Sequence, residues 1–476
     1  MVAKKEVSVG AIVFNRLWKV LLLKRKDKEL WEFPKGHVKK NENELQTLKR
    51  ELREETGITK FYLLSKRPEI NKYLNSKGYQ RIIKLFPVLT PTSKVALSKE
   101  HAKYMWGSLN EIKARLPHEN WCRLLDRICA NSSISLRKLL NIWDNHYPNL
   151  IKNELLIKRK EPTFRGSFPA INIIIPAYNY PKLLKLTLLS LHHQIWKNFE
   201  VFVIDDGSHM LNENMLKFLK KLNFKMTYIS LKNNKGAAFC RNVGIAFAKA
   251  PYLMFLDSDM VLPNDYLLHT VLKIRKCKNA VFVGFFHKAC SSKVQKVIRI
   301  RFKFAPDYTN DFRYQTKITK DFETFGLNVE LRTYKLLTET NFFLNFGNNK
   351  RLGVWNLPWM VVSSNFWLKR EHAVNVGGFS DKFKEWGFED TYFGAKLIGY
   401  GLYVIPAPVP TALKIIHRDR KGNSLSMKKR IMKTNFRLYK KLLKQPHNFF
   451  LLREKFLSEF NPKKLLQNID LIFKND

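Results

Sequence analysis

The sequence predicts an α/β fold class, with two α/β domains in one chain of 476 residues. This length exceeds that of one ordinary domain and favours two or three. Alternating apolar stretches at Val7–Phe14 and Val20–Lys24, followed by a helix-period run over residues 42–55, are typical of a small mixed α/β domain. From Ile171 onward, short apolar runs alternate with helical patterns, as in a parallel sheet with crossover helices.

The composition along the chain divides it into four segments. A leucine-rich helical piece at Ser135–Trp143 and a charged, proline-containing stretch separate the two domains. Residues 299–356 are aromatic and basic and match no element pattern. The expected segments are an N-terminal domain at 1–130, a helical linker at 131–168, a larger domain at 169–420 and a basic helical tail at 421–476.

The composition excludes several protein classes. With 45% hydrophobic and 26% charged residues, the chain is neither collagen-like nor disordered. No apolar run approaches the roughly 18–20 residues that span a bilayer, and Asn15, Arg16 and Lys19 interrupt the N-terminal apolar stretch, unlike a signal peptide. The five cysteines include no CxxC pair and predict neither a zinc site nor a disulfide framework. We therefore expect a cytoplasmic protein.

Basic residues outnumber acidic residues by 85 to 40, giving a net charge of +45. The excess occurs in every segment and is densest in the tail. It suits anionic substrates, polyanions or an acidic membrane surface. We expect no nucleic-acid partner, and a peripheral position at an anionic membrane surface is an alternative to a freely cytoplasmic one.

Residues 36–58 read GHVKKNENELQTLKRELREETGI. On a helix this spacing places Glu51, Glu54 and Glu55 on one face, where they repel one another unless cations lie between them. Such an oxygen-rich site suits Mg²⁺ or Mn²⁺, which can hold a diphosphate. Gly36 allows its carbonyl to approach the metal, and Gly57 can end the helix. The alternative is a solvated acidic helix whose spacing arises by chance.

This run fills every defined position of the Nudix box, and the segment resembles the Nudix hydrolases. The resemblance implies an α/β/α sandwich in which Glu51, Glu54 and Glu55 bind the metals and one of them helps to activate water. Glu42 and Arg50 would then form a supporting salt bridge.

The flanks WEFPKGHV at 31–38 and KEHAKYMW at 99–106 resemble the diadenosine tetraphosphate hydrolase branch over about residues 1–130. The basic loop at 39–41 departs from that branch, so the choice of nucleoside polyphosphate stays open.

The same resemblance assigns roles to three more residues. Lys35 would pair with a phosphate, Tyr104 would stack on a base, and Glu100 would be an additional metal ligand or base. For Tyr104 and Trp106, core packing is the open alternative.

In the second domain three predicted strands end in polar loops. The strand at 171–175 continues into PAYN, the strand at 200–204 into Asp205–Ser208, and the strand at 252–256 into Asp257–Asp259. Because the carboxyl ends of parallel strands meet at one edge, these loops converge on one crevice. An Asp-x-Asp there can hold a divalent cation that bridges the two phosphates of a nucleotide sugar.

The order IIPAYN, VIDDGS, NKG with a following Arg-Asn, and FLDSD resembles the family 2 glycosyltransferases, which have the Rossmann-like GT-A fold. Asp259 would be the surest metal ligand and Asp257 the second, whereas a turn or cap is the alternative for Asp205. The residues implied to bind the donor are Pro176, Tyr178, Asp206 and Arg241.

Farther along, the segment from Gly377 to Asp390 contains WGFED and resembles the WGxED segment of β-1,4-galactosyltransferases and chondroitin-polymerase-like enzymes. The resemblance implies inverting transfer with Asp390 as the base on the acceptor hydroxyl. Glu389 and Trp386 would position the acceptor sugar. The alternative is an N-cap carboxylate and a core tryptophan.

His417 follows Asp390 by 27 residues, where related enzymes supply an imidazole ligand to the same metal. A surface or core histidine is the alternative.

Together these patterns predict a bifunctional enzyme with Mg²⁺ or Mn²⁺ at both sites. One site would hydrolyse a nucleoside diphosphate derivative, and the other would transfer a sugar from a nucleotide sugar to a glycan or other hydroxyl acceptor. Two alternatives remain: a glycosyltransferase with a nucleotide-sensing Nudix domain, and a surface or polyanion-binding protein with relic catalytic domains. In the tail, basic residues within 428–444 share a helix with apolar ones, which indicates either membrane-surface binding or packing on the second domain.

Overall fold

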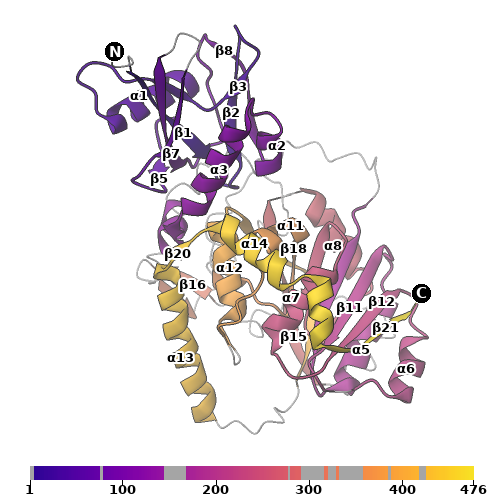
Figure 1. Ribbon diagram of the computed structural model, residues 1–476. Coiled ribbons are helices and arrows are strands. Elements are labelled where there is room, and N and C mark those ends of the chain that lie inside the picture. The colour runs from indigo at the N-terminus through magenta and orange to yellow at the C-terminus, as the bar shows by residue number, and fades with distance from the viewer. Residues whose placement is uncertain are drawn as a thin grey trace. The chain divides into compact units, whose positions relative to one another are not determined.

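The structure is a computed structural model of the 476-residue chain (Figure 1). The residues that it describes are 5–74, 79–143, 168–208, 210–276, 279–290, 316–319, 328–331, 358–383, 387–416 and 425–475. The chain divides into two compact units. The N-terminal unit comprises residues 1–146 and 445–451, and the C-terminal unit comprises residues 147–444 and 452–476.

The N-terminal unit contains an eight-stranded mixed sheet with the order β3-β2-β1-β7-β5, with β4 on β1, β6 on β7 and β8 on β2. Strands β1 and β7 run parallel, from the pair Lys5↔Gln80 to the pair Phe14↔Leu89. Its elements are β1 (Lys5–Phe14), β2 (Val20–Arg25), β3 (Trp31–Glu32), β4 (Lys35–His37), α1 (Glu44–Thr56), β5 (Tyr62–Leu63), β6 (Glu69–Leu74), β7 (Gln80–Leu89), β8 (His101–Gly107), α2 (Leu109–Lys113), α3 (Glu119–Asn131), β9 (Ile134–Ser135) and β20 (Pro446–His447).

Helix α1 is fixed at both ends and along its apolar face. A capping box joins Asn43 and Gln46 at its start, and Gly57 ends it in the left-handed conformation with φ 68°. Leu48 and Leu52 are fully buried against the core of the sheet. The neighbouring carboxylates of α1, of which Glu51 is itself buried, are therefore held by a rigid element.

Residues 445–451 belong to the N-terminal unit although they come late in the chain. Strand β20 pairs with β9, and the ring of Phe450 lies 5.3 Å from that of Phe14. A fragment of residues 1–130 lacks these contacts, so the experiments below use the full chain.

The C-terminal unit is built on a nine-stranded sheet with the order β14-β19-β15-β18-β13-β10-β11-β12-β21. Strands β13, β10, β11 and β12 are parallel neighbours, so their carboxyl ends share one edge. The elements up to residue 331 are β10 (Ile171–Ala177), α5 (Pro181–His192), β11 (Phe199–Asp205), α6 (Glu213–Leu219), β12 (Lys225–Leu231), α7 (Ala237–Phe247), β13 (Tyr252–Leu256), β14 (Met260–Val261), α8 (Tyr266–Lys276), β15 (Ala280–Cys290), β16 (Thr316–Thr319) and β17 (Asn328–Leu331).

The later elements complete this unit and add helix α14, which begins in the residues of the N-terminal unit. They are η2 (Pro358–Met360), β18 (Asn365–Lys369), α11 (Arg370–Asn375), α12 (Glu389–Gly399), β19 (Tyr403–Ile416), α13 (Leu425–Lys444), α14 (Phe449–Glu459), α15 (Pro462–Leu465), η3 (Leu466–Asn468) and β21 (Ile469–Asn475). Within the described residues, no helix is both long and apolar enough to cross a membrane.

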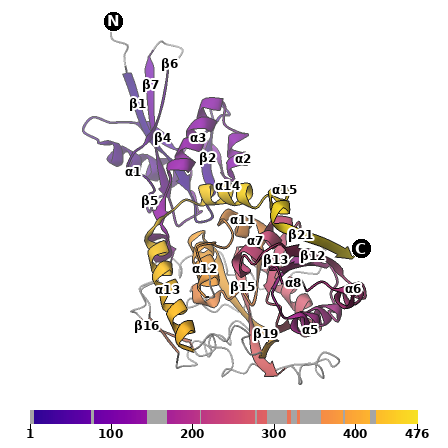
Figure 2. The same ribbon diagram turned by 60° about the horizontal axis from the view of Figure 1, so that its bottom comes forward.

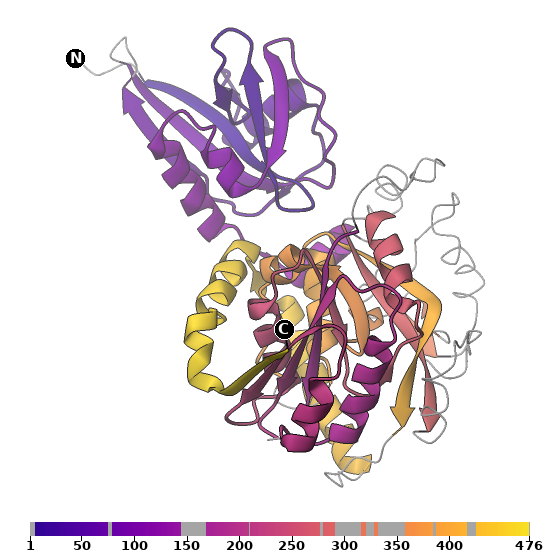
Figure 3. The ribbon, with the colours of Figure 1, turned by 90° about the vertical axis from the view of Figure 1, so that its right-hand side faces the viewer.

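The expectation of a purely helical tail over 421–476 is wrong in one respect. Strand β21 pairs antiparallel with β12 and forms the edge of the large sheet (Figure 3). Asn475 fixes this edge, because its side-chain oxygen accepts the Met226 N–H at 2.6 Å. The segment 469–475 is too short and too polar for its strand character to be evident without the neighbouring strand.

Helix α13 packs on helix α12 (Figure 2). Tyr439, Leu442 and Leu443 on its apolar side are at most 3% exposed. The ring of Tyr439 lies 5.5 Å from that of Phe388 and 6.5 Å from that of Tyr392. Because this apolar side is already buried in protein, the structure favours the packing alternative over insertion into a membrane surface.

Truncating Tyr439 to alanine tests this packing. Loss of a fully buried aromatic ring leaves a cavity, and we expect the free energy of unfolding to fall by about 3–5 kcal/mol. As a matched control on the same helix, the exposed Lys441→Ala should change it by less than about 0.5 kcal/mol. Equal, small effects in chemical denaturation would show that α13 does not pack as described.

Candidate active sites

In the N-terminal unit, helix α1 and strand β4 bring the predicted carboxylates against the backbone. A Cβ added to Gly36 would lie 2.0–2.3 Å from the carboxylate atoms of Glu51, so a larger residue at this position would displace that carboxylate. Glu55 accepts the backbone N–H of Lys35 at 3.0 Å. The backbone of β4 therefore lies against the acidic face of α1.

Arg50 links the acidic face to the loop before α1. Its guanidinium donates to Glu42 at 2.7 and 2.9 Å, which is the salt bridge that the sequence predicts. It also donates to Glu51 at 2.5 Å and to Glu54 at 3.1 Å. One cation thus orients the two carboxylates and offsets part of their repulsion.

The charges of this site favour the binding of a divalent cation. Burial raises the pKa of Glu55 to about 7, and the charge of Glu51 adds to the rise, whereas His101 and Lys35 oppose it. A carboxylate that is costly to ionise gains from a cation beside it. The residues present therefore fit Mg²⁺ or Mn²⁺ held by Glu51, Glu54 and Glu55, although no group of three His, Cys, Asp or Glu side chains is already gathered as a metal site among the described residues.

The remaining predicted residues of this unit occupy the edge formed by β8. Tyr104 is 42% exposed and free to contact a ligand. Trp106 packs against the core and donates its indole N–H to the Ser93 carbonyl at 2.9 Å, so it is a core residue. Glu100 is exposed before β8. The hydrogen bond with Asp27 is the main cause that raises the pKa of Arg25, and the charge of Glu100 adds to this rise.

A network of polar contacts around Glu32, next to Glu55, is not predicted from the sequence, although one of its members, Lys35, is a predicted site residue. His101 is 3% exposed, and its Nε2 lies 3.6 Å from Glu32. The ammonium of Lys35 pairs with the same carboxylate. Burial alone would raise the pKa of Glu32, but His101 and Lys35 outweigh it and lower that pKa to about 2. The only sequence signal for this network is that its members lie in the two segments flanking the glutamate helix.

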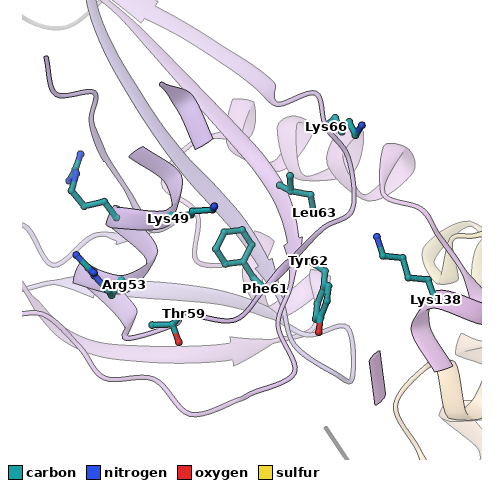
Figure 4. Close-up of a pocket in the computed structure, with 9 residues that line it drawn as sticks. Lys49, Arg53, Thr59, Phe61, Tyr62, Leu63, Lys66 and Lys138 are labelled. Atoms are coloured by element: carbon teal, nitrogen blue, oxygen red, sulfur yellow. The ribbon is translucent and has the colours of Figure 1, made fainter. Parts of the chain in front are cut away.

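Beside helix α1 the surface is hollowed into an open cavity of about 810 Å³ (Figure 4). Five of its nine lining residues are cationic and none is acidic, so this cavity is not a metal site. The lining residues are Lys49, Arg50, Arg53, Thr59, Phe61, Tyr62, Leu63, Lys66 and Lys138. The carboxylates of α1 are not among them.

In the C-terminal unit, the strand ends converge as parallel pairing requires. Asp206 is 5% exposed, and its carboxylate accepts the N–H groups of Lys235 at 2.7 Å and Gly236 at 2.9 Å. Its own N–H donates to the carbonyl of Ala177 at 2.9 Å, next to the half-buried Tyr178. Burial raises the pKa of Asp206. Through its backbone and its carboxylate, Asp206 therefore joins the ends of β10 and β11 to the start of α7.

Pro176 and Asp205, which neighbour these residues, make contacts that support the fold. Pro176 lies within β10, opposite Ile204 of β11. Asp205 is fully buried and accepts the hydroxyl of Tyr228 at 2.9 Å and the N–H of Met210 at 3.2 Å. The turn alternative considered for Asp205 is thus the one that its contacts support.

The two aspartates that follow β13, Asp257 and Asp259, form the acidic pair. Arg241 donates to Asp257 at 3.1 Å. The ammonium of Lys414 lies 3.2 Å from Asp257 and 3.6 Å from Asp259. Burial alone would raise the pKa of Asp257, but Lys414 and Arg241 hold it below its ordinary value.

The charges around the acidic pair differ from those of the N-terminal site. Two carboxylates face two cations, and the pair raises the pKa of Lys414 even though burial acts to lower it. The ammonium is therefore protonated at neutral pH. A divalent ion between the aspartates would have to displace it, so the described residues do not fit a metal at the acidic pair.

Helix α12 brings a second group of carboxylates close to Arg241. Glu389 and Asp390 lie in its first turn, and Arg241 reaches Glu389 at 3.6 Å. The helix starts from two residues with positive φ, Gly387 at 106° and Phe388 at 73°. A non-glycine residue in this region costs on the order of 1 kcal/mol, which is typical of a position held for function.

Asp390 is held in one orientation by backbone groups. Its two oxygens accept the N–H of Ser363 at 3.2 Å and that of Thr391 at 2.7 Å. Burial raises the pKa of Asp390, and burial together with repulsion from Asp390 raises the pKa of Glu389 to about 7. Arg241 thus contacts carboxylates from two segments that follow it in the chain, Asp257 after β13 and Glu389 at the start of α12. Trp386 and His417 lie outside the described residues.

The chain matches three known families. Residues 4–125 match the NUDIX domain, residues 172–347 match glycosyl transferase family 2, and residues 356–418 match the family described as the N-terminal domain of galactosyltransferase.

Among curated proteins, an uncharacterized glycosyltransferase, YfnE, of Bacillus subtilis is 28% identical over 48% of this chain and 61% of its own length. The chondroitin synthase of Escherichia coli is 28% identical over 52% of this chain and 35% of its own length. The chain therefore covers less than two thirds of each of these relatives.

Among solved structures, the Caenorhabditis elegans Ap4A hydrolase binary complex is 27% identical, with a TM-score of 0.25, covering 26% of this chain and 96% of the other. The Staphylococcus aureus TarS fragment 1–349 in complex with UDP is 16% identical, with a TM-score of 0.37, covering 62% of this chain and 72% of the other. The family matches coincide with the two sheets described above. The chain thus joins an N-terminal segment that matches the NUDIX domain to a segment that matches glycosyl transferase family 2, followed by a galactosyltransferase-like segment.

Proposed function

We propose that this protein is a bifunctional enzyme that hydrolyses a dinucleoside polyphosphate, or a similar nucleoside diphosphate derivative, and transfers a sugar from a nucleotide sugar to a hydroxyl acceptor. The observation that carries the proposal is the presence of two separate carboxylate groups, one on α1 and one around Asp390, each held by an arginine in its own unit.

In the hydrolase, Glu51, Glu54 and Glu55 would hold Mg²⁺ or Mn²⁺ against the carbonyl of Gly36. The cation supplies positive charge to the phosphates and makes bound water more acidic. Water attacks phosphorus, the anhydride P–O bond breaks, and the proton of the water passes to a carboxylate. Lys35 would face a phosphate, and the exposed Tyr104 would stack on a base.

In the transferase, Asp206 and Tyr178 would hold the base of the donor and Arg241 its diphosphate. The acceptor oxygen bonds to the anomeric carbon while the bond from that carbon to the diphosphate breaks. The electron pair leaves with the nucleoside diphosphate, and the acceptor proton passes to Asp390. Attack opposite the leaving group inverts the anomeric centre. Glu389, with Trp386, would hold the acceptor.

The raised pKa values give the transferase a pH dependence. Transfer at saturating substrates should slow as the pH falls through a midpoint set by the raised pKa of Asp390, because a protonated carboxyl group cannot accept the acceptor proton. Glu389→Gln removes the repulsion within the pair and should move this midpoint to lower pH. Glu389 also increases the free energy of unfolding at low pH. This contribution declines as the pH rises from 4.5 to about 7, because the folded state holds the Glu389 proton more tightly than the unfolded state does. A rate that increases on acidification would contradict the role of the pair.

The direct test of the proposed function is product analysis. The full chain, supplied with Mg²⁺ or Mn²⁺, is incubated with dinucleoside polyphosphates and with nucleotide sugars plus candidate acceptors. Mass spectrometry should find a cleaved nucleotide from the first mixture and a released nucleoside diphosphate from the second. The competing ideas of a nucleotide-sensing Nudix domain and of relic domains require the absence of one product or of both.

A further inference from the structure

An ammonium group lies between the two carboxylates of the acidic pair. Strand β19 fixes its position, because Lys414 pairs with Met260 in the sheet and the next residue, Ile415, donates its N–H to the Asp259 carbonyl at 2.8 Å. The backbone that carries Lys414 is thus hydrogen-bonded directly to the loop that carries the acidic pair.

The ammonium of Lys414 has donors with which it can bind an anion at this position. An ammonium has three N–H donors and no acceptor. Two of them face Asp257 and Asp259, at 3.2 and 3.6 Å, and the ammonium lies 5.6 Å from the centre of the Phe286 ring. Among the described residues no other acceptor binds it, which leaves one donor for an anionic ligand. The side chain is 29% exposed, so it is accessible to solvent.

Arg241 offers further donors at the same place. Its side chain is 4% exposed and uses one nitrogen on Asp257. Among the described residues, its buried Nε and Nη1 have no hydrogen-bond partner, although Nη1 is 3.6 Å from Glu389. Unsatisfied buried donors of a guanidinium are costly, and a phosphate oxygen would satisfy them.

We propose that Lys414 takes the place of a divalent cation at the acidic pair, so that Lys414 and Arg241 together bind the diphosphate of the donor. This rests on the proposed transferase function. Asp257 and Asp259 then orient the ammonium and do not ligate a metal. When the bond to the sugar breaks, the departing diphosphate keeps its electron pair, and these two cations neutralise the added charge.

The test measures binding of a nucleoside diphosphate rather than turnover. UDP, GDP, CDP and ADP are titrated calorimetrically into the full chain in EDTA and in Mn²⁺, and the tightest binder is used. All proteins carry Glu54→Gln and Glu55→Gln, so that the N-terminal site contributes no metal binding. Asp206→Asn, which should weaken binding, verifies that the transferase site is measured.

The dissociation constant of the parent protein in EDTA should lie within about threefold of that in Mn²⁺. Lys414→Met should weaken binding in EDTA at least ~10-fold, with partial recovery in Mn²⁺, and Lys414→Arg should retain most of the affinity. Lys369→Met is the matched control. It removes another lysine–carboxylate pair of the same sheet, with Glu371 at 3.1 Å, at the opposite end of β13, and should leave binding unchanged.

Two other outcomes overturn the inference in distinguishable ways. If the parent protein binds only with Mn²⁺ and Lys414→Met binds equally well, the acidic pair is a metal site and the transferase proposal survives. If no nucleoside diphosphate binds in either condition, the transferase proposal fails together with the inference. Thermal unfolding of each variant shows that the fold is retained.

Discussion

Replacing Glu55 by glutamine in the full chain is expected to slow dinucleoside polyphosphate hydrolysis at least ~100-fold. Glutamine keeps the acceptor oxygen for the Lys35 N–H, 3.0 Å away, and nearly the same volume, but it loses the negative charge that a divalent cation needs. The loss should therefore appear in catalysis and in metal affinity, whereas the fold is retained.

The matched control for this variant is Glu44→Gln on the same helix. Glu44 is 40% exposed and pairs with Lys84, away from Gly36 and Glu51. Its hydrolysis rate should stay within about twofold of that of the unmodified protein, since surface pairs of this kind contribute little. Undiminished activity of Glu55→Gln in a phosphate-release assay would remove Glu55 from the metal site.

The second large effect concerns sugar transfer. Asp390→Asn should lower the transfer rate at least ~100-fold while leaving donor affinity within about threefold, because general-base catalysis contributes on the order of 10²–10⁴. The amide still accepts one backbone N–H, from Ser363 or Thr391, so α12 should keep its place. Only the ability to take a proton is lost.

A split between rate and affinity is the informative result here. Calorimetric titration of the donor gives affinity, and single-turnover transfer gives the chemical step. If Asp390→Asn weakened donor binding and kept the chemical step, Asp390 would be a binding residue and the base would lie elsewhere.

The parts of this account that were predictable from sequence depend on short-range spacing. The i,i+3 and i,i+4 pattern of Glu51, Glu54 and Glu55 places them on one face wherever the helix lies. The helix end at Gly57 follows from the same run, and the Arg50–Glu42 salt bridge is the one that the resemblance to the Nudix hydrolases implies. The apolar runs that end in acidic loops likewise predict the parallel core of the large sheet.

The parts that were not predictable depend on long-range pairing. Lys414 reaches the acidic pair only because β19 pairs with β14, and nothing in the sequence around residue 414 indicates that register. His101 meets Glu32 because β8 and β3 both pair with β2, which is likewise a long-range arrangement. Strand β21 is recognisable only by its partner β12.

The most direct test of two independent enzymes on one chain compares three full-length proteins in one mixture: the unmodified chain, Glu55→Gln and Asp390→Asn. The mixture contains a dinucleoside polyphosphate, a nucleotide sugar and an acceptor, and products are followed by mass. We predict that Glu55→Gln loses only the cleaved nucleotide and that Asp390→Asn loses only the glycosylated acceptor. Loss of both products in either variant, or of neither in both, would contradict the account.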